Sequence, residues 1–163
     1  MQAAKDTFYV ALRDRLVQLN PALTITIDGA TRPAIVVEEN EPPASIPKQN
    51  DAFYLQWGEA QLVHPATSAL MMMGCVIVYT SQGEPESGGV GRGRDMATLD
   101  SDLLAICSPP QAHKYDYATG APVELGSFIF WSRPELKILK TELGQVGREA
   151  HIAVFFYPEV SQL

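Results

Sequence analysis

The stretch LMMMGCVIVY, residues 70–79, is almost wholly apolar. A stretch of this kind predicts a strand that is covered on both faces or that takes part in a contact with a partner. The segment 80–93 follows it with five glycines, which predicts a loop too flexible to belong to the core. We then expect an amphipathic helix that begins near Asp95 and places four apolar residues on one face, namely Met96, Leu99, Leu103 and Ile106.

Helical spacing is also clear near the beginning of the chain. Apolar residues recur from Phe8 to Leu19, so we expect a helix over residues 7–19. Asp6 or Thr7 is suited to cap it, because either side chain accepts a hydrogen bond from a free backbone N–H. Proline disfavours the helical conformation of the residue before it, so Asn20-Pro21 predicts the end of this helix.

Most other periodic segments predict strands. Residues 23–27 and 34–38 are β-branched and flank Asp28-Gly29, which predicts a hairpin, with Pro33 leaving its register open. A loop is expected over residues 39–51. Further strands are expected over residues 53–57, 115–117, 127–131 and 148–157, while residues 136–143 suit a helix or a strand. The order of elements predicts an α+β fold, with a mostly antiparallel sheet and two main helices packed on one face.

Size and composition narrow the class of protein. The 163 residues are expected to form a single domain, 1–163, and no apolar run reaches the ~20 residues of a membrane helix. The first residues lack the pattern of a secretory signal, so we expect a cytoplasmic chain that contacts no membrane. Cys75 and Cys107 have no metal-ligand spacing and are expected to be free, buried thiols. A net charge of −7 makes the chain a poor general binder of nucleic acid, and we expect no sequence-specific nucleic-acid partner.

The glycine-rich segment 88–94 (GGVGRGR) is the first candidate for chemistry. It lies between a strand and a helix, where backbone N–H groups and the helix N-terminus favour anions. No Gly-Lys-Ser/Thr closes it, so it is not a P-loop, and residues 80–87 separate it from the strand. The pattern therefore favours a loop over a phosphate site. Arg92 and Arg94 are two cations separated by a single residue. They can be solvated loop residues, or they can form a salt bridge to a neighbouring subunit.

No catalytic or metal-binding signature appears elsewhere. His64, His113 and His151 are far apart and share no ligand spacing, and no Gly-x-Ser-x-Gly is present. Asp95 suits a helix N-cap or the first helical turn, where the helix dipole stabilises a carboxylate. We therefore expect no catalytic residues, no metal and no cofactor.

Several segments resemble the tail-terminator, or tail-completion, minor tail proteins of long-tailed phages and prophages. The resemblance covers residues 91–104 (GRGRDMATLDSDLL), the strands at 128–131 and 148–155, and the opening helix that ends at Asn20-Pro21 before a hairpin. It extends over most of the chain as an order of elements. It implies an α+β subunit of a hexameric ring that ends the tail tube and offers a surface to the head–tail connector protein. Arg92, Arg94 and Asp95 are then candidates for ion pairs between subunits.

Two other classes of function remain open on these residues. One is an enzyme that binds a small ligand or a nucleotide through the glycine-rich segment 88–93. The other is a small α+β binding module of the toxin-immunity kind. The tail-protein interpretation instead places the chain in the virion tail, with the tail-tube protein and the connector as partners, after assembly in the host cytoplasm.

Overall fold

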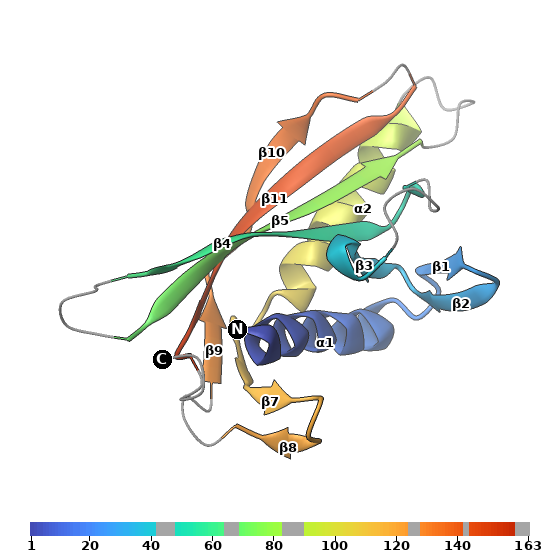
Figure 1. The fold of residues 1–163 in the computed structure, drawn as a ribbon. Coiled ribbons are helices and arrows are strands. Elements are labelled where there is room, and N and C mark those ends of the chain that lie inside the picture. The colour runs from blue at the N-terminus through green and yellow to red at the C-terminus, as the bar shows by residue number, and fades with distance from the viewer. Residues whose placement is uncertain (42–47, 64–68, 83–89, 124–127, 142–143, 159–163) are drawn as a thin grey trace.

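The computed structural model describes residues 1–41, 48–63, 69–82, 90–123, 128–141 and 144–158. Two helices, α1 (Gln2–Leu19) and α2 (Val90–Ile106), pack on one face of a mostly antiparallel sheet, which confirms the predicted α+β fold (Figure 1). None of the described helices is both long and apolar enough to cross a membrane.

The main sheet has seven strands in the described part of the chain. Their order is β3 (Ile35–Val37), β4 (Phe53–Leu62), β5 (Met71–Ser81), β11 (Val146–Phe156), β9 (Phe128–Trp131) and β6 (Gln111–His113). The seventh strand, β10 (Glu135–Leu139), pairs with β11 on the same side as β9 but farther along. Among the described strands, β3 and β4 alone pair in parallel. Two small sheets join β1 (Thr24–Ile27) to β2 (Ala30–Pro33) and β7 (Tyr115–Asp116) to β8 (Ala121–Pro122).

The apolar stretch forms the central strand β5, with β4 and β11 hydrogen-bonded on its two sides. Its side chains alternate: Met73, Cys75 and Ile77 are buried under the helices, whereas Met72 and Val76 on the other face are only partly buried. Among the described elements, most of this strand is covered on one face, so the first of the two alternatives does not hold there, and contact with a partner stays a prediction. A continuous apolar sequence does not by itself tell whether the second face is covered.

Helix α1 lies over the sheet through its apolar face. Phe8 is fully buried and meets the rings of Trp57 and Trp131 edge to face, with centroid separations of 5.5 and 5.1 Å. The helix begins at Gln2 with Met1 as its N-cap, five residues before the predicted start. Good helix formers at residues 2–5 extend it, so neither Asp6 nor Thr7 is the cap. The Thr7 hydroxyl instead donates to the Ala3 carbonyl oxygen at 2.6 Å.

The first hairpin forms at the predicted turn but with a different second strand. Asp28 and Gly29 both have positive φ, 50° and 79°, as a tight two-residue turn requires. Pairing therefore starts at once, with Ile27 opposite Ala30, and the second strand is β2 rather than residues 34–38. Proline lacks the N–H that would continue the ladder, so β2 ends at Pro33 and the following apolar residues join the main sheet as β3.

Helix α2 begins at Val90, not near Asp95, so residues 90–93 belong to its first turn and not to the loop expected over 80–93. Glycine weakens a helix by about 1 kcal/mol, but four buried residues anchor the helix downstream and growth of an existing helix is easier than nucleation. Strand β5 also continues to Ser81. Of the loop expected over 39–51, Glu38–Asn40 forms a 3-10 turn at its start and residues 42–47 lie outside the description.

The later strands follow the prediction more closely. Residues 135–139 adopt the strand alternative as β10, and the last strand begins slightly earlier than expected, at Val146. Cys75 and Cys107 are free and buried, as predicted. Burial raises the pKa of both thiols, that of Cys107 to about 12, so both remain protonated at neutral pH.

Candidate assembly surfaces

The face of the main sheet that lies away from the helices is largely uncovered by described elements. Among the described elements, β1 covers one corner, where Ile25 and Ile27 pack with Val36 and Tyr54 in a small second core. We call the remainder the outer sheet face. Its described side chains include Gln56, Gln61, Met72, Val76, Val78, His113, Phe128, Phe130, Lys137, Glu149, His151, Ala153 and Phe155.

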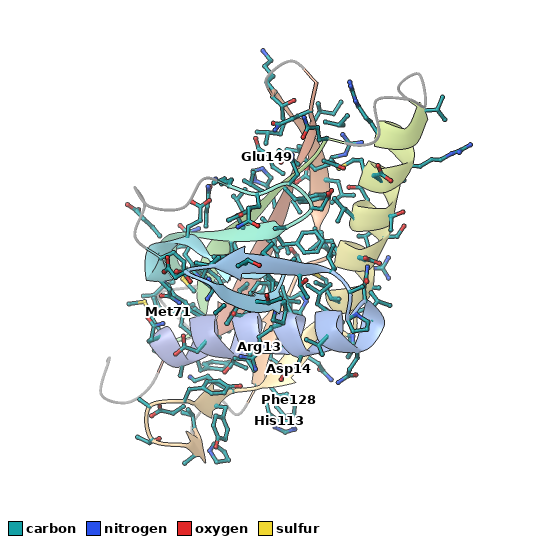
Figure 2. The ribbon with its side chains drawn as sticks, turned by 90° about the vertical axis from the view of Figure 1, so that its right-hand side faces the viewer. Arg13, Asp14, Met71, His113, Phe128 and Glu149 are labelled. Carbon is teal, nitrogen blue, oxygen red and sulfur yellow. The ribbon has the colours of Figure 1, made fainter. Side chains whose placement is uncertain are left out.

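Aromatic side chains gather at one end of the outer sheet face. Figure 2 shows His113 and Phe128 side by side below α1, and their ring centroids are 4.0 Å apart. Phe128 also stacks on Phe130, which is 43% exposed. An aromatic group on an uncovered sheet face is typical of a contact surface, because aromatic residues are enriched at protein interfaces.

The opposite end of the outer sheet face is polar and hollowed. A groove of about 490 Å³ lies there, with Val76, Val78, Lys140 and Glu149 among its lining residues. The Glu149 carboxylate lies 3.0 Å from Nε2 of His151 on the same strand. The charged residues among its described lining are Lys48, Lys140 and Glu149.

The sequence-predicted contact residues lie at the N-terminal end of α2. Arg94 and Asp95 are exposed and form no ion pair within the described ranges. Arg92 is partly buried, and its Nε has no hydrogen-bond partner among the described residues. The three residues are thus close in sequence on one helix end, but Asp95 is neither the N-cap nor in the first turn, because the helix starts earlier.

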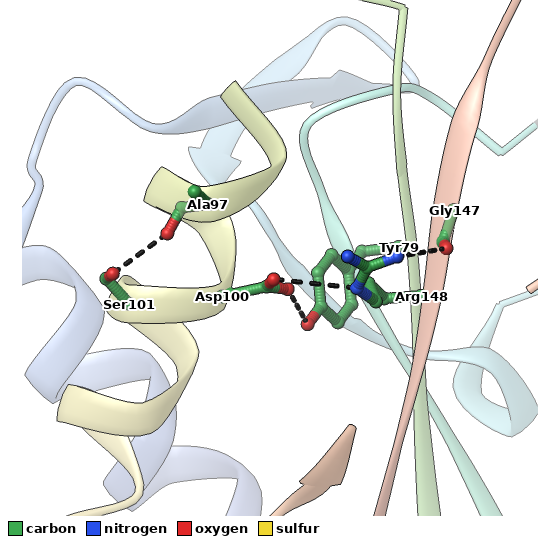
Figure 3. Close-up of polar contacts among 6 residues, drawn as sticks. All are labelled: Tyr79, Ala97, Asp100, Ser101, Gly147 and Arg148. Carbon is green, nitrogen blue, oxygen red and sulfur yellow. Dashed lines mark hydrogen bonds and ion pairs between the residues drawn. The ribbon is translucent and has the colours of Figure 1, made fainter. Parts of the chain in front are cut away.

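Helix α2 is attached to the sheet by a polar contact that the sequence did not reveal. The Tyr79 hydroxyl donates to Oδ1 of Asp100 at 2.6 Å, and Nε of Arg148 lies 3.5 Å from Oδ2 of the same carboxylate (Figure 3). Tyr79 and Arg148 are opposite each other on β5 and β11. One aspartate therefore connects α2 to two central strands, and only the strand register brings its partners together.

We expect Tyr79→Phe to change the pH dependence of stability. Burial raises the pKa of the Tyr79 phenol, and the hydrogen bond to Asp100 raises it further. Above about pH 10 the unfolded state loses this proton while the folded state keeps it, so the free energy of unfolding falls by up to about 1.4 kcal/mol per pH unit. Tyr79→Phe removes this part of the fall and costs about 0.5–1.5 kcal/mol at neutral pH.

Urea denaturation of both proteins between about pH 8 and pH 11 measures this difference. The wild-type curve should fall more steeply than that of Tyr79→Phe over the alkaline part of the range. Parallel curves would show that Tyr79 does not couple proton binding to folding. Tyr157→Phe, at a tyrosine that is 43% exposed, is the matched control.

The other candidate groups remain apart. His113 lies in β6 and His151 in β11, while His64 falls outside the described residues. No group of three or more His, Cys, Asp or Glu side chains within the described ranges is arranged to hold a metal ion. Of the glycine-rich segment, residues 88 and 89 are not described and residues 90–93 are helical, which differs from the loop that the nucleotide-binding alternative assumed.

Comparison with known proteins assigns no family to the chain. No protein-family model matches it, and no curated protein matches it.

Proposed function

We propose that this chain is a structural virion protein of a phage tail. It forms a hexameric ring that ends the tail tube and offers a surface on which the head–tail connector joins. Its partners are further copies of itself, the tail-tube protein and the connector protein. It acts by binding in the virion tail, after assembly in the host cytoplasm, and not by catalysis.

The outer sheet face is the observation that carries this proposal. Its side chains include Val76, Phe128, Phe130 and Phe155, and no described element covers them. An uncovered apolar surface of this kind is typical of a protein that works through contact with other chains. The overall net charge of −7 is consistent with protein partners, because binding to phosphate backbones requires clustered cations.

The end of α2 adds a second, polar contact. Arg94 and Asp95 are adjacent, exposed and without ion-pair partners in the described part of the chain. A different surface of a neighbouring subunit can supply the opposite charge to each. A contact between different surfaces of identical subunits closes into a ring when its rotation closes.

Light scattering and negative-stain microscopy over a range of protein concentrations test the proposal. We expect ring particles at high concentration and addition of these rings to the ends of purified tail tubes. A chain that stays monomeric at every concentration and does not bind tail tubes would contradict it.

A substitution on the outer sheet face makes the test specific. Phe130→Asp should weaken addition to tail tubes by about tenfold or more, because it places a charge where an aromatic ring is buried on binding. Tyr117→Asp is the control, since Tyr117 is similarly exposed, 46% against 43%, but lies outside the main sheet. Equal binding by the two variants would exclude the outer sheet face as the contact.

A further inference from the structure

Strand β4 has a free outer edge over its second half. The parallel strand β3 pairs only with Phe53–Leu55, and no described strand pairs with the outer side of β4 beyond that point. A bulge between Trp57 and Ala60 interrupts the ladder with β5, and regular pairing resumes over Ala60–Leu62. Leu62 is 46% exposed. Backbone groups alternate in direction along an antiparallel ladder, and the Val63 N–H donates to the Leu70 carbonyl oxygen of the β5 side, so Ala60 and Leu62 direct their backbone groups to the free edge, where another strand can bind.

Strand β10 has the second free edge. It pairs with β11 on one side, from Glu135 opposite His151 to Leu139 opposite Gly147, and with no other described strand. Ile138, in the middle of this edge, is 81% exposed. A large aliphatic side chain this exposed on an unpaired edge strand is typical of a surface that binds another strand.

The two edges present their apolar side chains on the same face of the sheet. Residues directly opposite each other in a ladder share a face. Ile138 lies opposite Arg148 and Leu136 opposite Ala150, whereas Ala60 lies opposite Met73 and Leu62 opposite Met71. Alternation places all of these on the helix-covered face. If the edges met, Leu136 and Ile138 would therefore lie beside Ala60 and Leu62.

The polar residue between the apolar residues of each edge also lies on the same face in both strands. Lys137 lies opposite Glu149 and Gln61 opposite Met72, so both are on the outer sheet face. The pairs β4–β5, β5–β11 and β11–β10 are all antiparallel, so β10 of one copy meets β4 of the next in the antiparallel direction when their helix-covered faces lie on the same side. With the apolar residues adjacent, Gln61 then comes opposite Lys137.

The charges at the two edges favour contact between unlike edges. Arg133, Lys137 and Lys140 are exposed at or beside β10. Lys137 lies 3.7 Å from Glu135 and opposite Glu149 of β11, so these three cations outnumber the two acids beside them. The free half of β4 has a single charged residue, Glu59, at the bulge. Two β10 edges would repel each other, whereas β10 and β4 attract. This charge pattern selects a contact between different edges over a symmetric one.

We propose that β10 of one copy pairs with the Ala60–Leu62 edge of β4 in a second copy, so that the main sheet continues from subunit to subunit. The inference rests on the proposed ring and names the contact that builds it. Each subunit uses one edge for each neighbour, so the contact repeats in one direction. The pairing is short, and the bulge limits its length, which keeps it reversible and restrains uncontrolled growth through the edges.

Cysteine crosslinking tests the contact directly. Gln61→Cys and Lys137→Cys, prepared as separate proteins, are mixed and treated with a short thiol-reactive crosslinker. We expect a covalent dimer from the mixture and none from either variant alone. Wild type is the control, because Cys75 and Cys107 are buried. Dimers from Lys137→Cys alone would indicate symmetric pairing of β10 and would overturn the proposal.

An exposed substitution provides a second measurement that does not depend on crosslinking. Ile138→Asp should raise the concentration for half-maximal assembly by about tenfold, because it removes the apolar contact from a residue that is solvated in the monomer. Leu104→Asp, at an exposed position of α2, should leave assembly unchanged. Far-UV circular dichroism checks that both variants remain folded.

The results of these experiments distinguish a failure of the edge pairing from a failure of the proposed function. Rings that form normally with Ile138→Asp, and that give no Gln61–Lys137 crosslink, would overturn the edge pairing and leave the ring proposal intact. Wild-type protein that never assembles would overturn both. Rings, a crosslink in the mixture alone and a selective effect of Ile138→Asp would together support the edge pairing.

Discussion

Phe8→Ala is expected to lower the free energy of unfolding by about 3–5 kcal/mol, the range for removing a buried phenylalanine. Phe8 is 0% exposed and lies between Trp57 of β4 and Trp131 of β9. Truncation leaves a cavity where α1 meets two strands that are far apart in the sheet, and it also removes two edge-to-face ring contacts. Urea denaturation monitored by tryptophan fluorescence measures the loss, since both tryptophans border the cavity.

Two further variants serve as comparisons for Phe8→Ala. Phe8→Leu keeps most of the volume and should cost clearly less than Phe8→Ala. Val17→Ala, at a 44% exposed position of the same helix, should change stability by about 0.5 kcal/mol or less. A loss below about 1 kcal/mol for Phe8→Ala would show that α1 contributes little to the core.

The second large effect is expected at Arg15, where substitution by alanine should cost about 2–4 kcal/mol. Its guanidinium donates to three carbonyl oxygens at the end of α2 and beyond, those of Ile106, Pro109 and Gln111, at 2.8–3.0 Å. It also lies 5.3 Å from the centroid of the Trp131 ring. Arg15→Ala leaves these carbonyl groups without their donor and removes a cation–π contact.

Thermal and urea denaturation of Arg15→Ala, Arg15→Lys and Arg13→Ala measure this effect. Lysine lacks the planar set of N–H donors of a guanidinium group, so Arg15→Lys should retain only part of the stability that Arg15→Ala loses. Arg13, labelled with Asp14 in Figure 2, donates to this neighbouring carboxylate at the surface of α1 and lies 5.8 Å from the centroid of the Tyr9 ring, so Arg13→Ala should cost about 1 kcal/mol or less. Equal losses at Arg13 and Arg15 would contradict a specific role for the three carbonyl contacts.

The predicted boundaries of helices and strands were wrong where tertiary contacts outweighed the local sequence pattern. The glycines at 91 and 93 indicate a loop locally, yet α2 includes them because its buried residues hold the helix that they extend. The second strand of the hairpin was misplaced because the Asp28-Gly29 turn closes with only two residues. In both cases the type of element was correct and its boundary depended on neighbours that a local pattern does not contain.

The candidate contact residues were only partly accessible to prediction. Arg92, Arg94 and Asp95 were recognisable as an unusual group of charges. The free edges of β4 and β10 were not, because an edge is defined by the strand order, and strand order joins segments such as 35–37 and 53–55 with no common signal in their composition. The Tyr79–Asp100–Arg148 contact could not be predicted either, because it also depends on which strands pair.

By itself, the amino-acid sequence determined the α+β class, the central apolar strand, the two amphipathic helices and the free buried thiols. These properties follow from spacing and composition over short segments, where burial of apolar side chains dominates. Only the tertiary structure decided which sheet face stays uncovered, which strand edges remain unpaired and which charges meet. Those features depend on the pairing of distant segments, which is selected by the packing of the whole core and not by any one stretch of residues.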